Sequence, residues 1–181
     1  MASPSSTPHH TTSSSKHAKT ARFKISSSAG SNILIYDVEV TNDDECVTVK
    51  SPADHLLIES VHCNIAGGNA IGSLQPNTDI SYVHYCNIYS NQAGGLYINS
   101  YGGSGTLSAC LFENSVLRKS PNTGQQCLLE QENFRDTNEK SARPVVRYEC
   151  PAEVPCYDTT LGDIYLWTED GDAVTWSCSS A

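Results

Sequence analysis

Residues 30–73 read GSNILIYDVEVTNDDECVTVKSPADHLLIESVHCNIAGGNAIGS, and this stretch decides the fold. Its apolar segments are short and rich in β-branched or aromatic residues, as in ILIYDVEV (33–40), CVTVK (46–50) and LLIESV (56–61). Such segments are typical of strands, because a helix needs apolar residues at 3.6-residue spacing over a longer run. Gly and Asn clusters such as AGGNAIGS (66–73) separate them as turns. The stretch therefore predicts an all-β fold.

A small polar residue followed by a mostly aliphatic one recurs outward from this stretch. The pairs are Asp37-Val38, Ser60-Val61, Asn87-Ile88, Asn114-Ser115, Asn133-Phe134 and Asp163-Ile164, at steps of 23, 27, 27, 19 and 30 residues. A period of this size indicates stacked repeats. The L-x-x-L-x-L frame of leucine-rich repeats is absent from HLLIESVHCN and DISYVHYCNI. We therefore expect parallel β-coils stacked about 4.8 Å apart, with the 19-residue step as a partly deleted coil.

The N-terminal segment differs in composition from the rest. Residues 1–29 are rich in Ser, Thr, His and Lys, so we expect a disordered or extraneous leader, followed by one β-helix domain over 30–181. The start of the leader lacks the apolar core of a secretory signal, and no stretch of the chain is long enough to span a membrane. The strand at 33–40 would then be an open edge that favours self-association, unless residues 20–29 fold back as a cap.

Charge and cysteine content exclude several functions. The net charge is −9, and no Asp or Glu precedes Asp37. An acidic body argues against a nucleic-acid partner. Eight cysteines without a CxxC or CxxH pair favour an oxidising compartment over a zinc site. We expect His62 and His84 to be ordinary strand residues rather than metal ligands. Residues 169–172 are expected to form a turn rather than a calcium loop, so we expect neither metal nor cofactor.

Several motifs within 30–178 resemble glycoside hydrolase family 28, the polygalacturonase superfamily, in its rhamnogalacturonan hydrolase branch. That branch has a pattern close to N-x-D-E-C-V-T-V-K-S-P-A, then an S-I/V-x-C-N strand and a G-G-x-A-x-G-S turn, all present here in order. Further matches are SNQ (90–92), GGSGT (102–106), LFEN (111–114), RPVVRYEC (143–150) and PCYDTTLGDIYLWTEDG (155–171). The resemblance implies a right-handed parallel β-helix of the pectin-lyase-like type, incomplete at its N-terminus, and an O-glycosyl hydrolase.

The resemblance also implies the catalytic residues. Inverting hydrolysis needs one carboxylic acid to protonate the leaving oxygen and a carboxylate about 6.5–9.5 Å away to activate water. Asp44 is implied as the general acid and Glu45 as a water-activating carboxylate. Crowding with Asp43 disfavours simultaneous ionisation, which helps to separate the two roles. Without the resemblance, a D-D-E run is typical of a solvated turn or a calcium-attracting cluster.

Two features of the implied site depart from the family. The family places a further carboxylate one coil earlier, but the window ARFKISSS (21–28) contains no acid. Lys24 near that place would pair with Asp44 and favour its ionised form, the wrong state for an acid. Where relatives carry a cation in an I-K-S strand, this chain has Asn99, which lacks the charge for a uronate carboxylate. The implied substrate-binding residues are Asn99 and also Asn69, which lies in the glycine turn.

The family pattern further implies two disulfides, Cys46–Cys63 and Cys150–Cys156. Buried free thiols are the alternative at these positions. The remaining cysteines are left without assigned partners: Cys86, Cys110, Cys127 and Cys178. The cysteine content and the resemblance together predict an extracellular protein.

The predicted function is hydrolysis of a pectin backbone, rhamnogalacturonan or polygalacturonate, with a pectic polysaccharide as partner and activity impaired in this chain. Two alternatives remain from the sequence. One is a non-catalytic module that binds pectin or titrates an inhibitor protein. The other is an inactive gene remnant.

Overall fold

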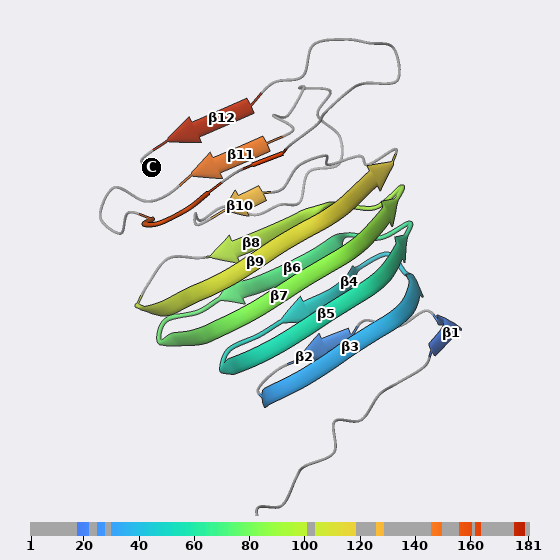
Figure 1. Cartoon of the computed structure of the whole chain (residues 1–181), viewed down its shortest axis with the longest axis horizontal. Coiled ribbons are helices and arrows are strands. Elements are labelled where there is room, and N and C mark those ends of the chain that lie inside the picture. Colours follow the sequence, from blue (N-terminus) through green and yellow to red (C-terminus); the bar gives the residue numbers. More distant parts are fainter. Residues whose placement is uncertain are drawn as a thin grey trace, which may run out of the picture.

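The computed structural model is a stack of parallel coils (Figure 1). It describes residues 18–21, 25–27, 30–100, 104–118, 126–128, 146–149, 156–160, 162–163 and 176–179. The strands are β1 (Ala18–Ala21), β2 (Ile25–Ser27), β3 (Gly30–Thr41), β4 (Glu45–Val49), β5 (Ala53–Asn64), β6 (Gly68–Leu74), β7 (Thr78–Asn91), β8 (Leu96–Ser100), β9 (Gly105–Arg118), β10 (Gln126–Leu128), β11 (Val146–Glu149) and β12 (Trp176–Ser179).

From β1 to β10, successive strands alternate between two sheets. The long-strand sheet has the order β1-β3-β5-β7-β9, and the short-strand sheet has the order β12-β11-β10-β8-β6-β4-β2. The pairings within both sheets are parallel, so each turn of the chain lays one long and one short strand on the turn before (Figure 1). The expected parallel β-helix is confirmed.

The recurring polar residue of the sequence marks a corner of the coil. Asp37, Ser60, Asn87 and Asn114 have φ angles of 52, 54, 54 and 49°. The register on either side aligns them in one column across β3, β5, β7 and β9. Asn and Asp tolerate this left-handed conformation best among residues with a Cβ, because their short polar side chains bond locally. The first three repeat steps are therefore steps from coil to coil.

A second left-handed corner lies earlier in each long strand. It is formed by Asn32, His55, Tyr82 and Ala109, which also align in register. The last two repeat pairs fall elsewhere: Asn133 lies outside the described residues, and Asp163 has a φ of 50° but belongs to no described strand. Of the 19-residue step expected as a partly deleted coil, only residues 114–118 and 126–128 are described, so that coil stays a prediction.

The core lies between the two sheets. From the short strands it takes Val47, Val49, Ile71, Leu96 and Ile98, and from the long strands mainly Leu56, Ile58, Val61, Ile80, Val83, Tyr85 and Ile88. Tyr85 has no exposed surface, and its hydroxyl donates to the Ala70 carbonyl at 2.9 Å and, at a longer 3.4 Å, to that of Val47. One side chain of the long-strand sheet thus reaches the backbone of β4 and β6.

Strands β1 and β2 precede Gly30 in the sequence, and each adds one strand to the N-terminal side of a sheet. Ala18 pairs with Val38 and Ala21 with Val40, while β2 pairs with β4 through Ile25 and Val47. The second half of β3 is therefore not an open edge, because β1 and β2 form a further parallel coil before it. The leader boundary at residue 29, and self-association through this end, remain predictions. No helix in the described part of the chain is long and apolar enough to cross a membrane.

Candidate active site

The acidic turn, residues 42–45, connects β3 to β4 and holds itself together through side-chain bonds to its own backbone. The Asp44 N–H donates to Asn42 Oδ1 at 3.1 Å, and Asn42 Nδ2 donates to the Glu45 carbonyl at 3.0 Å. The Glu45 N–H donates to Asp44 Oδ1 at 2.9 Å. Asn and Asp favour turns because their side chains replace backbone partners in this way. The sequence N-D-D-E thus builds a defined turn that presents two adjacent carboxylates.

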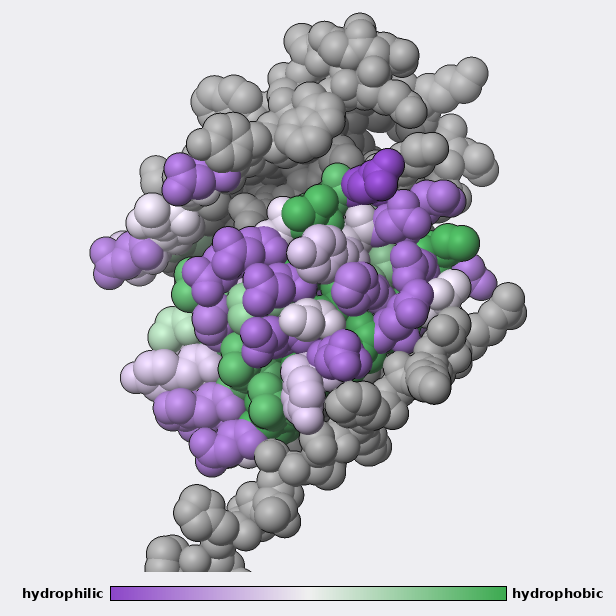
Figure 2. Space-filling view, turned by 45° about the vertical axis from the view of Figure 1, so that its right-hand side comes forward, coloured by the Kyte–Doolittle hydropathy of each residue, from purple (hydrophilic) through white to green (hydrophobic). Residues whose placement is uncertain are grey.

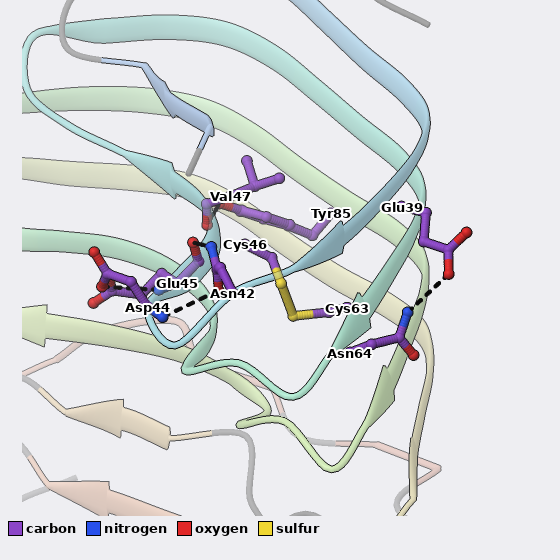
Figure 3. Close-up of a disulfide and its surroundings, with 9 residues drawn as sticks. All are labelled: Glu39, Asn42, Asp44, Glu45, Cys46, Val47, Cys63, Asn64 and Tyr85. Atoms are coloured by element: carbon purple, nitrogen blue, oxygen red, sulfur yellow. Dashed lines mark hydrogen bonds between the residues drawn. A yellow bond between two sulfur atoms is a disulfide. The ribbon is translucent and has the colours of Figure 1, made fainter. Parts of the chain in front are cut away.

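A disulfide anchors the residue that follows the turn. Cys46 and Cys63 are fully buried and bonded, with their Cα atoms 5.9 Å apart, which confirms the first implied pair. The bond joins β4 to the next coil, and the Asp44 and Glu45 carboxylates point away from it (Figure 3). Cys156 is also disulfide-bonded, but Cys150 lies outside the described residues, so the second pair remains a prediction. Cys86 and Cys110 are free thiols.

Glycines bring the next coil close to the acidic turn. The Gly67 N–H donates to the Asp44 carbonyl at 2.9 Å, and Gly68 pairs with Glu45 in the ladder. Gly68 has a φ of 105°, and a Cβ there would lie 2.4 Å from the Gly95 carbonyl oxygen. Only glycine fits this position. Gly68 thus allows the coil of Gly95 to stack closely on the glycine turn, while a Cβ at Gly67 would lie 3.3 Å from the Glu45 nitrogen of the acidic turn.

Tyr97 reaches the turn from β8. Its hydroxyl donates to Glu45 Oε1 at 3.0 Å. Burial raises the pKa of Tyr97 far above its usual range, and the nearby charge of Glu45 adds to the increase. The phenol therefore keeps its proton and remains a donor. The sequence reasoning missed Tyr97, although strand alternation would have placed it on the same face as Asn99, two residues along.

The two predicted binding residues lie in different places. Asn99 is on β8 between the core-facing Ile98 and Ser100, on the face of Tyr97, and its Nδ2 donates to Ser73 Oγ at 3.1 Å. Asn69 shares a ladder position with the core residues Val47 and Leu96, and it has no exposed surface. Within the described residues neither amide atom of Asn69 has a hydrogen-bond partner. Asn69 as a substrate-binding residue stays a prediction, and its side chain lies in the core rather than at the surface.

The two strand histidines contact neighbouring side chains. The ring of His62 stacks on Tyr89 with centroids 4.9 Å apart, and His84 Nε2 lies 2.8 Å from Glu113 Oε1. No cluster of three or more potential ligands that could hold a metal occurs in the described part of the chain.

One outer face of the coils is mainly hydrophilic with small apolar patches (Figure 2). Lys24, the expected neighbour of Asp44, lies outside the described residues.

Stacked parallel coils with an acidic turn at the start of a short strand define the class of protein, a parallel β-helix with a candidate carboxylate site. The model of the family described as "Glycosyl hydrolases family 28" matches residues 9–125. The chain therefore belongs to family 28 of the glycosyl hydrolases. The match begins within the expected leader, at residue 9.

Three relatives illustrate the similarity. A probable rhamnogalacturonase C of Aspergillus flavus is 46% identical over 167 residues, covering 84% of this chain and 37% of the relative. Rhamnogalacturonase A of Aspergillus aculeatus is 42% identical over 171 residues, covering 84% and 39%. A probable rhamnogalacturonase B of Aspergillus fumigatus is 41% identical over 169 residues, covering 83% and 32%. The chain thus spans between 32% and 39% of the length of these relatives.

Proposed function

We propose that the chain carries the site of an inverting glycoside hydrolase that cuts the backbone of pectin, with rhamnogalacturonan as the first candidate substrate and polygalacturonate as the second. The observation that carries the proposal is the acidic turn, which presents Asp44 and Glu45 side by side on a family 28 β-helix. The names of the relatives support rhamnogalacturonan. The buried disulfide supports an oxidising, extracellular location.

In this proposal Asp44 protonates the leaving glycosidic oxygen and Glu45 activates water. The two roles are complementary, because an inverting enzyme needs one proton donor and one proton acceptor across the scissile bond. Asn99 contacts the polysaccharide as a neutral hydrogen-bonding group from the face that also carries Tyr97. The coil that precedes β4 in the stack contains β2. It carries no carboxylate, because the sequence contains no Asp or Glu before Asp37. We therefore expect low turnover, because a missing carboxylate in a cooperating set costs orders of magnitude in rate.

The test measures new reducing ends released from rhamnogalacturonan and from polygalacturonate. Asp44→Asn and Glu45→Gln should abolish a slow but measurable activity. Asp79→Asn is the matched control, because it makes the same change on an exposed residue of β7, outside the acidic turn. Reducing ends that never exceed those of a blank, or an Asp44→Asn variant as active as Asp79→Asn, would contradict the proposal.

A further inference from the structure

The contact between Tyr97 and Glu45 spans three strands. Tyr97 lies on β8 and Glu45 on β4, and β6 runs between them in the short-strand sheet. Neighbouring strands are about 4.8 Å apart, so the hydrogen bond of 3.0 Å requires the Tyr97 side chain to cross β6. It crosses on the outer face, because Leu96 and Ile98 on either side of Tyr97 belong to the core.

Small residues provide the path for the ring. The ladder position of Tyr97 holds Ala70 on β6 and Thr48 on β4, and Gly68 lies opposite Glu45. Ala70 is 2% exposed and Thr48 is 1% exposed, although alternation turns both toward the outer face. Their burial is consistent with a ring lying over this column. A large side chain at residue 70 would obstruct it.

The hydrogen bond constrains the carboxylate. A carboxylate offers two oxygens to donors in its plane, so a donor fixed at Oε1 also sets the direction of Oε2. Tyr97 lies on β8, which is paired with β6, and its phenol remains protonated as described above. A bond from a neutral donor to a charged acceptor is stronger than one between neutral groups. The orientation of Glu45 is therefore set by a side chain that is distant in sequence.

We infer that Tyr97 is a positioning residue that holds the Glu45 carboxylate in the orientation used to activate water. This inference rests on the proposed function, since it assigns Glu45 its role there. Tyr97 acts through Glu45 and takes part in no proton transfer. Its loss should change the rate of the chemical step and leave the binding of the polysaccharide unchanged.

The experiment compares Tyr97→Phe with Tyr89→Phe, which makes the same change on a ring that is 47% exposed on β7. Three-bond NMR couplings of Glu45 report its side-chain rotamer, and steady-state kinetics give kcat and KM. Tyr97→Phe should average the Glu45 couplings and lower kcat about tenfold at unchanged KM, equivalent to about 1.4 kcal/mol of transition-state free energy. Tyr89→Phe should change neither.

A second measurement approaches the same bond from the other partner. Glu45→Gln should shift the ¹³Cζ resonance of Tyr97, and Asp43→Asn should leave it in place. Glu45 couplings that are the same in the wild type and Tyr97→Phe would overturn the inference, and so would altered couplings with an unchanged kcat. If the wild type releases no reducing ends, the proposed function fails, and the NMR comparison alone then decides whether Tyr97 orients Glu45.

Discussion

The buried hydroxyl group of Tyr85 should contribute to the stability of the coil. It lies on β7 with no exposed surface, and its hydroxyl donates to backbone carbonyls of β6 and β4. These two strands also carry the glycine turn and the acidic turn. The substitution Tyr85→Phe removes the donor and keeps the ring, which stacks on Phe112 with centroids 5.3 Å apart.

The size of the effect follows from the two contacts. The bond to Ala70 at 2.9 Å has ordinary length, and the one to Val47 at 3.4 Å is too long to add much. A buried hydrogen bond contributes about 0.5–1.5 kcal/mol net, and a buried acceptor that loses its donor adds a further cost. No cavity forms beyond the volume of one oxygen. We therefore expect Tyr85→Phe to lower the free energy of unfolding by about 1–2 kcal/mol.

The assay is urea unfolding at neutral pH followed by far-UV circular dichroism, with the slope m checked to be equal between variants. Tyr89→Phe is again the control, because it lies on the same strand with its ring 47% exposed. Its free energy of unfolding should stay within about 0.5 kcal/mol of the wild type. Equal values for Tyr85→Phe and Tyr89→Phe would refute the link between the sheets through the phenol.

Three further predictions concern the same coils. Replacing both Cys46 and Cys63 by Ala should lower the free energy of unfolding by about 3 kcal/mol, because the disulfide closes a loop with a sequence separation of 17; equal stability of the oxidised wild type and the double variant would contradict this. Burial raises the pKa of Tyr85 and of Tyr97, so above the unfolded value of about 10 the unfolded chain releases protons that the folded chain keeps. Stability should be unaffected by these groups below that pH and fall above it by about 1.4 kcal/mol per pH unit for each buried tyrosine, a slope that should be smaller in Tyr85→Phe. Asn87→Ala should cost about 1 kcal/mol and Asn87→Gly less, since residue 87 has a φ of 54° that a side chain of Ala disfavours; equal losses for the two variants in urea unfolding would argue against the corner.

The fold could be predicted because its periodic signal has a local cause. The coils of β3, β5, β7 and β9 each turn at a left-handed residue, and Asp37, Ser60 and Asn87 are short polar residues suited to that place. The second corner gave no such signal, because His55 and Tyr82 occupy it in two of the coils. Their rings stack with centroids 4.5 Å apart, so packing between coils, which the sequence does not reveal, compensates the local preference.

The candidate site could be predicted only in part, for a related reason. The acidic turn is held by bonds between residues one to three positions apart, so its sequence specifies it. The place of Asn69 depends on how β6 aligns with its neighbours, and a register shift between Glu45 and Val47 sets that alignment. The reach of Tyr97 across β6 depends on small residues at two other coil positions. Such contacts follow from stacking, and no local pattern predicts them.

The contacts that position Asp44 and Glu45 are distinct from the groups that would set the rate of the proposed reaction. Three contacts hold the turn in place: the Cys46–Cys63 disulfide directly after it, the Gly67 N–H of the next coil, and the Tyr97 hydroxyl at Glu45. None of these contacts involves a carboxylate on the preceding coil. Under the proposed function, the absence of an acidic residue from that coil would lower turnover and leave the geometry of the pair in place. We therefore expect Asp44→Asn and Glu45→Gln to lower turnover without lowering the free energy of unfolding. Kinetics and unfolding must be measured on the same proteins to test this.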